Sequence, residues 1–170
     1  LSLHDALPIL PHFSDLTIVC NGKLNDAGRE KLLRYTSKLI VRENRGFDVW
    51  AYKTALDSYG WHKLEQFDEI VLFNATIMGP VYPFSEMFDA MNKRDLDFWG
   101  ITKFHRVEHD PFGRSPYPYL PEHIQSHFHA YRKSLHTSQA FREYWDNIPP
   151  INDYYDSVGL HESLFTKRFA

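Results

Sequence analysis

The stretch KLIVRENRGFDVWAYKTAL, residues 38–56, places a strand, a polar loop and a helix in direct succession. The apolar-rich segment from Lys38 to Val41 predicts a strand, and from Asp48 the apolar residues recur at helical spacing until Gly60. Asp48 is well placed as the N-cap of that helix. The polar run from Arg42 to Asp48 therefore follows the carboxyl end of a strand, where open α/β sheets bind ligands.

The same order of strand and polar turn occurs twice more. The β-rich run LTIVC, residues 16–20, ends at Asn21 and Gly22. The run EIVLF, residues 69–73, is nearly continuous in apolar residues, as in parallel strands that are buried on both faces, and the loop 74–79 follows it. Because the carboxyl ends of parallel strands share one edge, we expect these polar segments to line one pocket.

The rest of the chain alternates helical and strand patterns around one long loop, residues 105–122, which is rich in Pro and Tyr. Loops of this length in compact domains are usually functional or mobile. The order of elements predicts an α/β fold with a mostly parallel sheet flanked by helices. The further helices are expected at 25–35, 83–91, 138–145 and 153–169, and the further strands at 97–104 and 126–133.

Composition describes an ordinary globular chain. Its 170 residues are 43% hydrophobic and 24% charged, which excludes a disordered tail and fits one domain. The net charge of -3 gives no electrostatic case for nucleic acid as a partner. The single cysteine, Cys20, excludes a disulfide within the chain and favours the cytosol. We find no apolar run long enough to span a bilayer, so we expect a soluble domain.

Both ends of the chain call for separate treatment. Residues 1–9, LSLHDALPI, resemble the in-frame translation of a sequencing-library adapter and lack the pattern of a signal peptide. We expect this segment to be non-native. The last residues, KRFA, stop inside a helical pattern without a cap. We therefore expect residues 10–170 to form a single domain that is truncated at both ends.

Histidines and aromatic residues gather in the second half of the chain. His127 and His129 are two residues apart on a predicted strand and would share one face as a metal pair, while His105, His109 and His123 precede them. A metal hydrolase is one hypothesis for this cluster, although ordinary core and surface histidines are the favoured interpretation. The aromatic segment 112–119 suits either stacking on a sugar or packing as a lid.

Four ordered blocks of the sequence resemble one known family, the rhamnan synthesis protein F family. The blocks are RENRGFDVWAYKTAL (42–56), EIVLFNATIMGPVYPFSEMF (69–88), DFWGITKF (97–104) and QSHFHAYRKSL (125–135). The resemblance runs from about Leu16 to Ala170. It implies a GT-A-like, Rossmann-like nucleotide-sugar-binding fold and a glycosyltransferase that adds rhamnose to bacterial surface polysaccharides. The implied partners are a nucleotide-sugar donor and a glycan or lipid-linked glycan acceptor, met in the cytoplasm at the inner membrane.

The resemblance also suggests roles for particular residues. Glu162 is the candidate general base, with Asp110 in the long loop as a weaker rival. A magnesium or manganese ion would neutralise the diphosphate, with Thr76, His127 and His129 as weak candidate ligands. The alternative is purely structural, with Asp48 capping its helix and Gly46 turning the chain. The candidates for contact with the nucleotide sugar are Asn21, Arg42, Asn44, Gly46, Asp48, Asn74 and Thr76.

One residue departs from the family pattern. Where members usually carry Asp, this chain has Ala75, and a methyl group neither ligates a cation nor accepts a hydrogen bond. Either the metal is lost, or Asn74 or Thr76 takes part of its role, or activity is gone. An active transferase and a catalytically impaired domain that only binds nucleotide sugar or glycan are therefore competing hypotheses.

Overall fold

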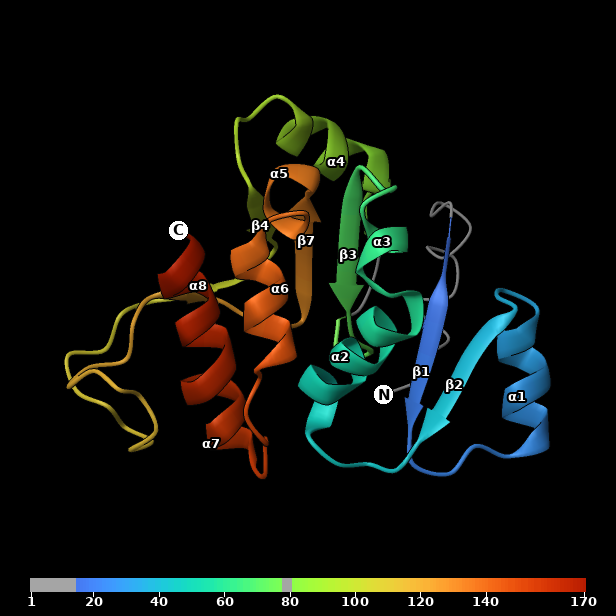
Figure 1. Ribbon diagram of the computed structural model, residues 1–170, viewed down its shortest axis with the longest axis horizontal. Helices are drawn as coiled ribbons and strands as arrows, with labels where there is room; N and C mark the ends of the chain where they lie inside the picture. Colours follow the sequence, from blue (N-terminus) through green and yellow to red (C-terminus); the bar gives the residue numbers. More distant parts are fainter. Residues whose placement is uncertain (1–14, 78–80) are drawn as a thin grey trace.

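A parallel pair of strands forms the amino-terminal part of the fold. The computed structural model describes residues 15–77 and 81–170, so the adapter-like segment 1–9 lies outside the described residues. Strand β1 (Thr17–Asn21) pairs in parallel with β2 (Lys38–Arg42), and helix α1 (Asp26–Leu33) connects them (Figure 1). The carboxamide of Asn25 caps α1 by accepting from the Gly28 amide at 2.8 Å. These three elements confirm the sequence-based predictions.

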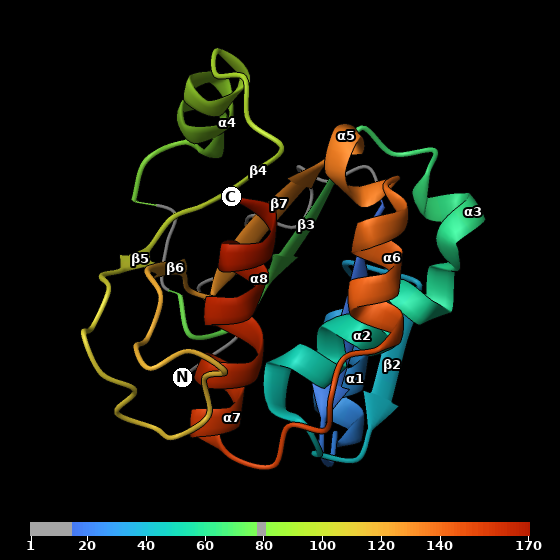
Figure 2. The same ribbon diagram turned by 60° about the vertical axis from the view of Figure 1, so that its left-hand side comes forward.

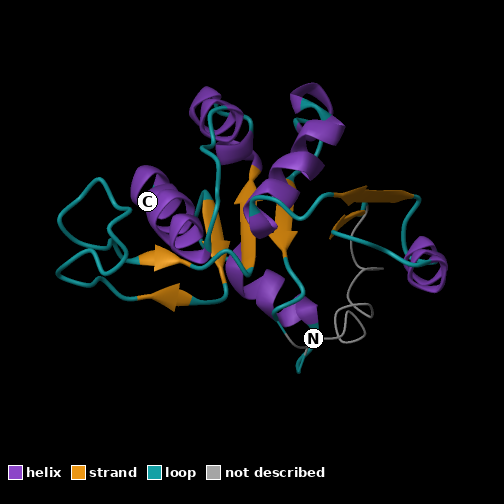
Figure 3. Cartoon of the chain, turned by 90° about the horizontal axis from the view of Figure 1, so that it is seen from below, coloured by secondary structure: helices purple, strands orange, loops and turns teal. Residues whose placement is uncertain are grey.

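The central sheet is antiparallel. Strand β7 (Phe128–Arg132) lies between β3 (Glu69–Phe73) and β4 (Phe98–Gly100) and is antiparallel to both. Four of the five residues of β7 are buried, because helices cover both faces of this sheet (Figure 3). His129 of β7 stands opposite Leu72 of β3, and both residues are buried in the interior of the molecule.

The prediction of a mostly parallel, GT-A-like or Rossmann-like sheet flanked by helices is wrong. The described residues form a two-stranded parallel sheet, a three-stranded antiparallel sheet and a small antiparallel pair, β5 (Lys103–Phe104) with β6 (His123–Ile124). The apolar run in β3 does show burial, but a strand between helices is buried in either orientation. The apolar sequence of β3 therefore indicated that the strand is buried, but not whether its partner strand runs parallel or antiparallel to it.

The single strand predicted at 97–104 is divided between two sheets. Strand β4 ends at Gly100, and β5 begins at Lys103 in the small pair with β6. A Cβ at Gly100 would lie 2.2 Å from Cγ2 of Ile124, so only glycine fits where the chain leaves the sheet.

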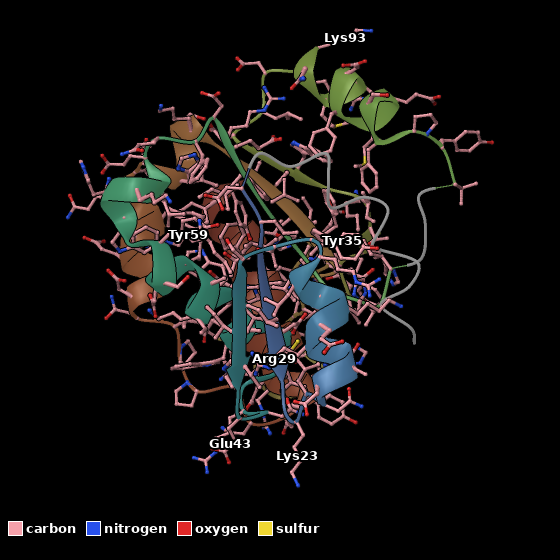
Figure 4. All side chains as sticks on the ribbon, turned by 90° about the vertical axis from the view of Figure 1, so that its right-hand side faces the viewer. Lys23, Arg29, Tyr35, Glu43, Tyr59 and Lys93 are labelled. Atoms are coloured by element: carbon pink, nitrogen blue, oxygen red, sulfur yellow. The ribbon has the colours of Figure 1, made fainter. Side chains whose placement is uncertain are left out.

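Helices form a layer on each side of the strands. Helix α2 (Phe47–Tyr59) and helix α3 (Trp61–Leu64) lie on one side, with α1 and α4 (Phe84–Asn92) on the other (Figures 3 and 4). Helix α4 packs its apolar stripe on the face of β4 and β7, where Trp99 and Phe128 are buried. The carboxyl-terminal helices are α5 (Lys133–His136), α6 (Gln139–Asp146), α7 (Tyr154–Asp156), the π-helix η3 (Ser157–Glu162) and α8 (Ser163–Phe169).

The long loop 105–122 runs beside α7 and α8 as a strap (Figure 2). Arg114 Nε donates to Asp156 Oδ1 at 2.7 Å, and its Nη2 lies 3.3 Å from Asp153 Oδ2. The ring of Phe112 stacks on Tyr155 with centroids 5.2 Å apart. The strap 105–122 is thereby fixed to α7 by one ion-pair cluster and one aromatic contact.

Candidate functional site

A cavity of about 550 Å³ lies between β1 and β3, and α2 forms its third wall. This volume is within the range of small-molecule sites. Strands β1 and β3 belong to different sheets and point the same way, so their carboxyl ends lie at one end of the cavity (Figure 1). Four polar lining residues from these ends and from α2 form what we call the polar rim: Asn21, Lys23, Asp48 and Asn74.

Asp48 is the hub of the polar rim. Its Oδ2 accepts from Asn74 Nδ2 at 2.8 Å and from the hydroxyl of Ser126 at 3.0 Å. Its Oδ1 accepts from the Val49 amide at 3.0 Å. Asp48 and Asn74, both predicted site residues from different elements, are therefore in direct contact.

Ser126 joins the polar rim to the π-helix, and sequence reasoning missed it. Its amide donates to Glu162 Oε1 at 2.7 Å, while its carbonyl accepts from the Tyr52 hydroxyl at 2.8 Å. Burial, with a smaller contribution from the Asp48 charge, raises the pKa of Tyr52 well above its ordinary value. The predicted base Glu162 is thus linked to Asp48 through one intervening residue.

Glu162 lies at the end of η3 and is only 6% exposed. Its Oε2 is 3.6 Å from Nε2 of His123, which is fully buried and donates from Nδ1 to the Pro121 carbonyl at 2.8 Å. π-helical turns are frequent at functional sites. The rival base Asp110 instead accepts from the amides of Phe112 and Ser115 inside the strap.

The loop after β2 is held by side chains of the predicted site. Arg42 donates from Nη1 to Asn21 Oδ1 at 2.7 Å and from Nη2 to the Arg45 carbonyl at 2.7 Å. Asn21 Nδ2 in turn donates to the Phe47 carbonyl at 2.8 Å. Asn21 and Arg42 thus come together, while the predicted Asn44 is exposed nearby.

The expectation that Asp48 caps α2 is wrong. Helix α2 begins at Phe47, and its N-cap is Gly46 with φ 73. Phe47 also has a positive φ, 54, so two consecutive residues adopt the left-handed region. This turn places Asp48 in the first turn of the helix, where its carboxylate reaches Asn74 and Ser126.

Comparisons with known proteins identify the relatives of the chain. Residues 16–170 match the family model described as Rhamnan synthesis protein F. The chain belongs to this family. The resemblance of the four sequence blocks to this family is therefore confirmed.

A curated relative is the uncharacterized protein y4gN of Sinorhizobium fredii (strain NBRC 101917 / NGR234). It is 26% identical over 154 residues, which are 91% of this chain and 38% of the relative. The chain thus spans about two-fifths of the length of that protein. No solved structure matches. Within residues 15–77 and 81–170, no helix combines the length and apolarity needed to cross a membrane.

The predicted metal ligands do not assemble into one set. Thr76 Oγ1 bonds to His127 Nδ1 at 2.9 Å and also to Asn74 Oδ1. His129 instead bonds to the Tyr131 hydroxyl at 2.7 Å inside the core, and burial lowers its pKa to about 4. Across the described parts of the chain, no group of three or more His, Cys, Asp or Glu side chains could hold an ion. The metal-hydrolase hypothesis therefore gains no support.

The polar rim offers few free oxygen ligands to a magnesium or manganese ion. These hard cations are bound through carboxylates and other oxygens. Of the three carboxylates lining the cavity, Asp15 pairs with Lys38 and Glu69 accepts from Trp99. Both oxygens of the third, Asp48, already accept from protein donors. Ala75 lines the cavity where the family resemblance calls for a carboxylate.

Proposed function

We propose that the chain binds a nucleoside-diphosphate sugar at the polar rim and transfers the sugar, rhamnose, to a growing bacterial surface polysaccharide. The observation that carries this proposal is the convergence of Asp48, Asn74 and Glu162 around Ser126. Asp48 on α2 and Asn74 at the end of β3 line a cavity of about 550 Å³, and Ser126 links Asp48 to Glu162 of the π-helix behind the cavity wall. Membership of the rhamnan synthesis protein F family supports rhamnose as the proposed sugar.

The polar rim offers donors and acceptors suited to a nucleotide. Asp48 is a charged acceptor for a ribose hydroxyl or a base N–H, because carboxylates form strong charge-assisted hydrogen bonds. Asn74 orients that carboxylate from the end of β3. Beyond the polar rim most of the cavity lining is apolar or aromatic, including Tyr52 and Phe73, with Asp15, Thr17 and Glu69 as further polar residues.

The role of Glu162 as the general base stays a prediction, and the geometry suggests a direct test. A base must reach the acceptor hydroxyl, whereas Glu162 is nearly buried and its Oε1 holds the Ser126 amide. In Glu162→Gln the amide oxygen still accepts from Ser126, but proton uptake is lost. A base role predicts that kcat falls by about a hundredfold at unchanged KM. A positioning role predicts that KM rises and that kcat changes little.

The proposed function is tested with the full-length protein. Uridine, guanosine and thymidine diphosphate sugars are each offered with a rhamnan-type acceptor, and transfer and donor hydrolysis are both measured. We expect turnover of one donor class, with loss of its binding in Asp48→Ala. Absence of binding, transfer and hydrolysis with every donor would overturn the proposal.

A binding domain without catalysis is the second candidate, and Ala75 is the observation that favours it. Ala75 lines the cavity next to Asn74. If activity was lost together with a carboxylate, Ala75→Asp should gain transfer that depends on magnesium or manganese. If the natural chain already transfers sugar and Ala75→Asp adds nothing, this second candidate is excluded.

A further inference from the structure

Two cations, Lys23 in the polar rim and Arg42 bonded to the rim residue Asn21, have no carboxylate partner among residues 15–77 and 81–170. Lys23 lines the cavity and is exposed, and no described acidic side chain pairs with it. Arg42 bonds only to neutral oxygens, those of Asn21 and the Arg45 backbone. Arg45, in the loop after β2, is neutralised by Glu43 at 3.1 Å. Lys23 and Arg42 therefore carry positive charge that no described carboxylate pairs with, while the rim carboxylate Asp48 accepts only from the neutral donors Val49, Asn74 and Ser126.

The backbone brings these two cations to one place. Gly22 has φ 96, which lets the chain turn directly after β1, and its amide donates to the Arg42 carbonyl at 2.8 Å. This bond ties the end of β1 to the end of β2, so Lys23 and Arg42 project from adjacent strand ends. Figure 4 shows Lys23 at this edge of the molecule, at the opposite end from Lys93.

The two side chains suit different tasks. Arg42 is held by two hydrogen bonds and so presents a positioned guanidinium with further N–H donors. Lys23 is a flexible point charge, and such lysines bind phosphate oxygens directly. An anion with two adjacent charged groups, such as a diphosphate, matches a fixed cation beside a mobile one.

We propose that Lys23, with Arg42, neutralises the diphosphate of the ligand, so that nucleotide binding needs no divalent cation. This inference rests on the proposed function and refines it. It explains how Ala75 is compatible with binding, because the charge that a metal would supply comes from side chains on β2 and after β1. An added carboxylate at position 75 then opposes the anion.

The test is calorimetric titration of the full chain with uridine, guanosine and thymidine diphosphates, in chelator and again in magnesium or manganese. We expect the affinity for the bound nucleotide to differ by less than about twofold between these buffers. We expect Lys23→Ala to weaken binding about tenfold or more, as for a hydrogen bond to a charged group. Lys23→Arg should retain most of the affinity.

Lys93→Ala is the matched control, because it removes the same charge from an exposed position on the opposite end of the molecule. It should bind like the parent chain. Ala75→Asp should bind more weakly than the parent in chelator. Binding that appears only with a divalent cation, or that is equal in Lys23→Ala and Lys93→Ala, would overturn the inference. Failure of every nucleotide to bind in either buffer would instead reject the proposed function.

Discussion

Ser126 shows how a single residue can organise a site. It is 3% exposed, and its amide, carbonyl and hydroxyl each bond to a different residue, namely Glu162, Tyr52 and Asp48. Two of these bonds use the backbone and persist in any substitution that preserves the fold. Only the hydroxyl bond to Asp48 depends on the side chain, so it can be removed by itself.

Ser126→Ala should therefore lower the free energy of unfolding by about 1.5–3 kcal/mol, because one buried hydrogen bond to a charged acceptor is lost. It should also weaken nucleotide binding, since Asp48 loses one of the donors that orient it. Ser134→Ala is the matched control, because its hydroxyl bonds to the Asp97 carboxylate at an exposed position. Urea denaturation measures both variants. An equal loss in the two would show that burial of the Asp48 bond adds nothing.

Gly46 provides a second test at this scale. It has φ 73, and a Cβ there would lie 2.3 Å from Cδ1 of Trp50. Gly113 has a similar φ, 63, but a Cβ there would meet nothing within 4 Å. Gly113→Ala should cost only the left-handed strain, about 1 kcal/mol, whereas Gly46→Ala should cost clearly more because Trp50 must move. Thermal unfolding of both variants measures this difference, which should vanish if Trp50 yields freely.

The residues of the polar rim were predictable only where a strand pattern pointed to them. Asp48 and Asn74 follow recognisable strands, and the structure places them 2.8 Å apart. Lys23 also follows a strand, but an exposed lysine carries no signal of its own. Ser126 and His123 precede β7, in a block of family resemblance and a histidine-rich stretch, but neither pattern indicates their roles, which come from contacts with a residue 36 and 39 positions away.

At the scale of elements, most strands and helices could be read from the sequence, but strand direction could not. The positions of β1, β2, β3 and α4 agree with the predictions because each has a clear apolar pattern. Pairing of β3 with β7 joins residues separated by about 60 positions, and apolar spacing holds no information on such partners. The π-helical turn of η3 was equally invisible, because it resembles an ordinary helix in sequence.

Loss of the Arg114 contacts should let the strap 105–122 detach locally from α7 while the rest of the protein stays folded. Arg114 connects it to Asp153 and Asp156 on the side of α7. Arg114→Ala should therefore speed limited proteolysis within the strap several-fold while the main unfolding transition shifts by about 1–2 kcal/mol at most. Arg106→Ala is the matched control, because Arg106 pairs with Glu108 inside the strap and anchors nothing outside it. Equal cleavage rates in both variants would contradict an anchoring role for Arg114.

At the scale of the whole molecule, two buried imidazoles make the fold sensitive to acid. His161 and His129 have ring centroids 6.4 Å apart in the main aromatic core, and both are almost completely buried. Burial, reinforced by the neighbouring His129, lowers the pKa of His161 to about 3, and burial lowers that of His129 to about 4. Each imidazole is therefore neutral in the folded protein under conditions in which the unfolded chain already binds a proton.

This arrangement sets the pH range of the last prediction. Between pH 6.5, the ordinary value, and about 4, the unfolded chain binds more protons than the folded protein, so stability falls as pH falls. Each imidazole contributes about 1.4 kcal/mol per pH unit to this slope. Three carboxyl groups with lowered pKa values, those of Asp15, Asp110 and Asp156, act only below about their ordinary value of 3.8. The histidine effect is therefore separable by pH.

We expect His161→Gln to reduce the slope of unfolding free energy against pH by the contribution of one imidazole, about 1.4 kcal/mol per pH unit. This expectation holds whatever the substitution does to stability at a single pH. His136 also has a pKa lowered by burial, so a residual slope should remain even without His129 and His161. His62→Gln, at an exposed position on α3, is the control and should leave the slope unchanged. Urea unfolding at several pH values between 4.5 and 7 gives each slope directly. A slope in His161→Gln equal to that of the parent would mean that this imidazole takes up its proton without unfolding, and that the core around Trp145 and Tyr144 opens locally to water.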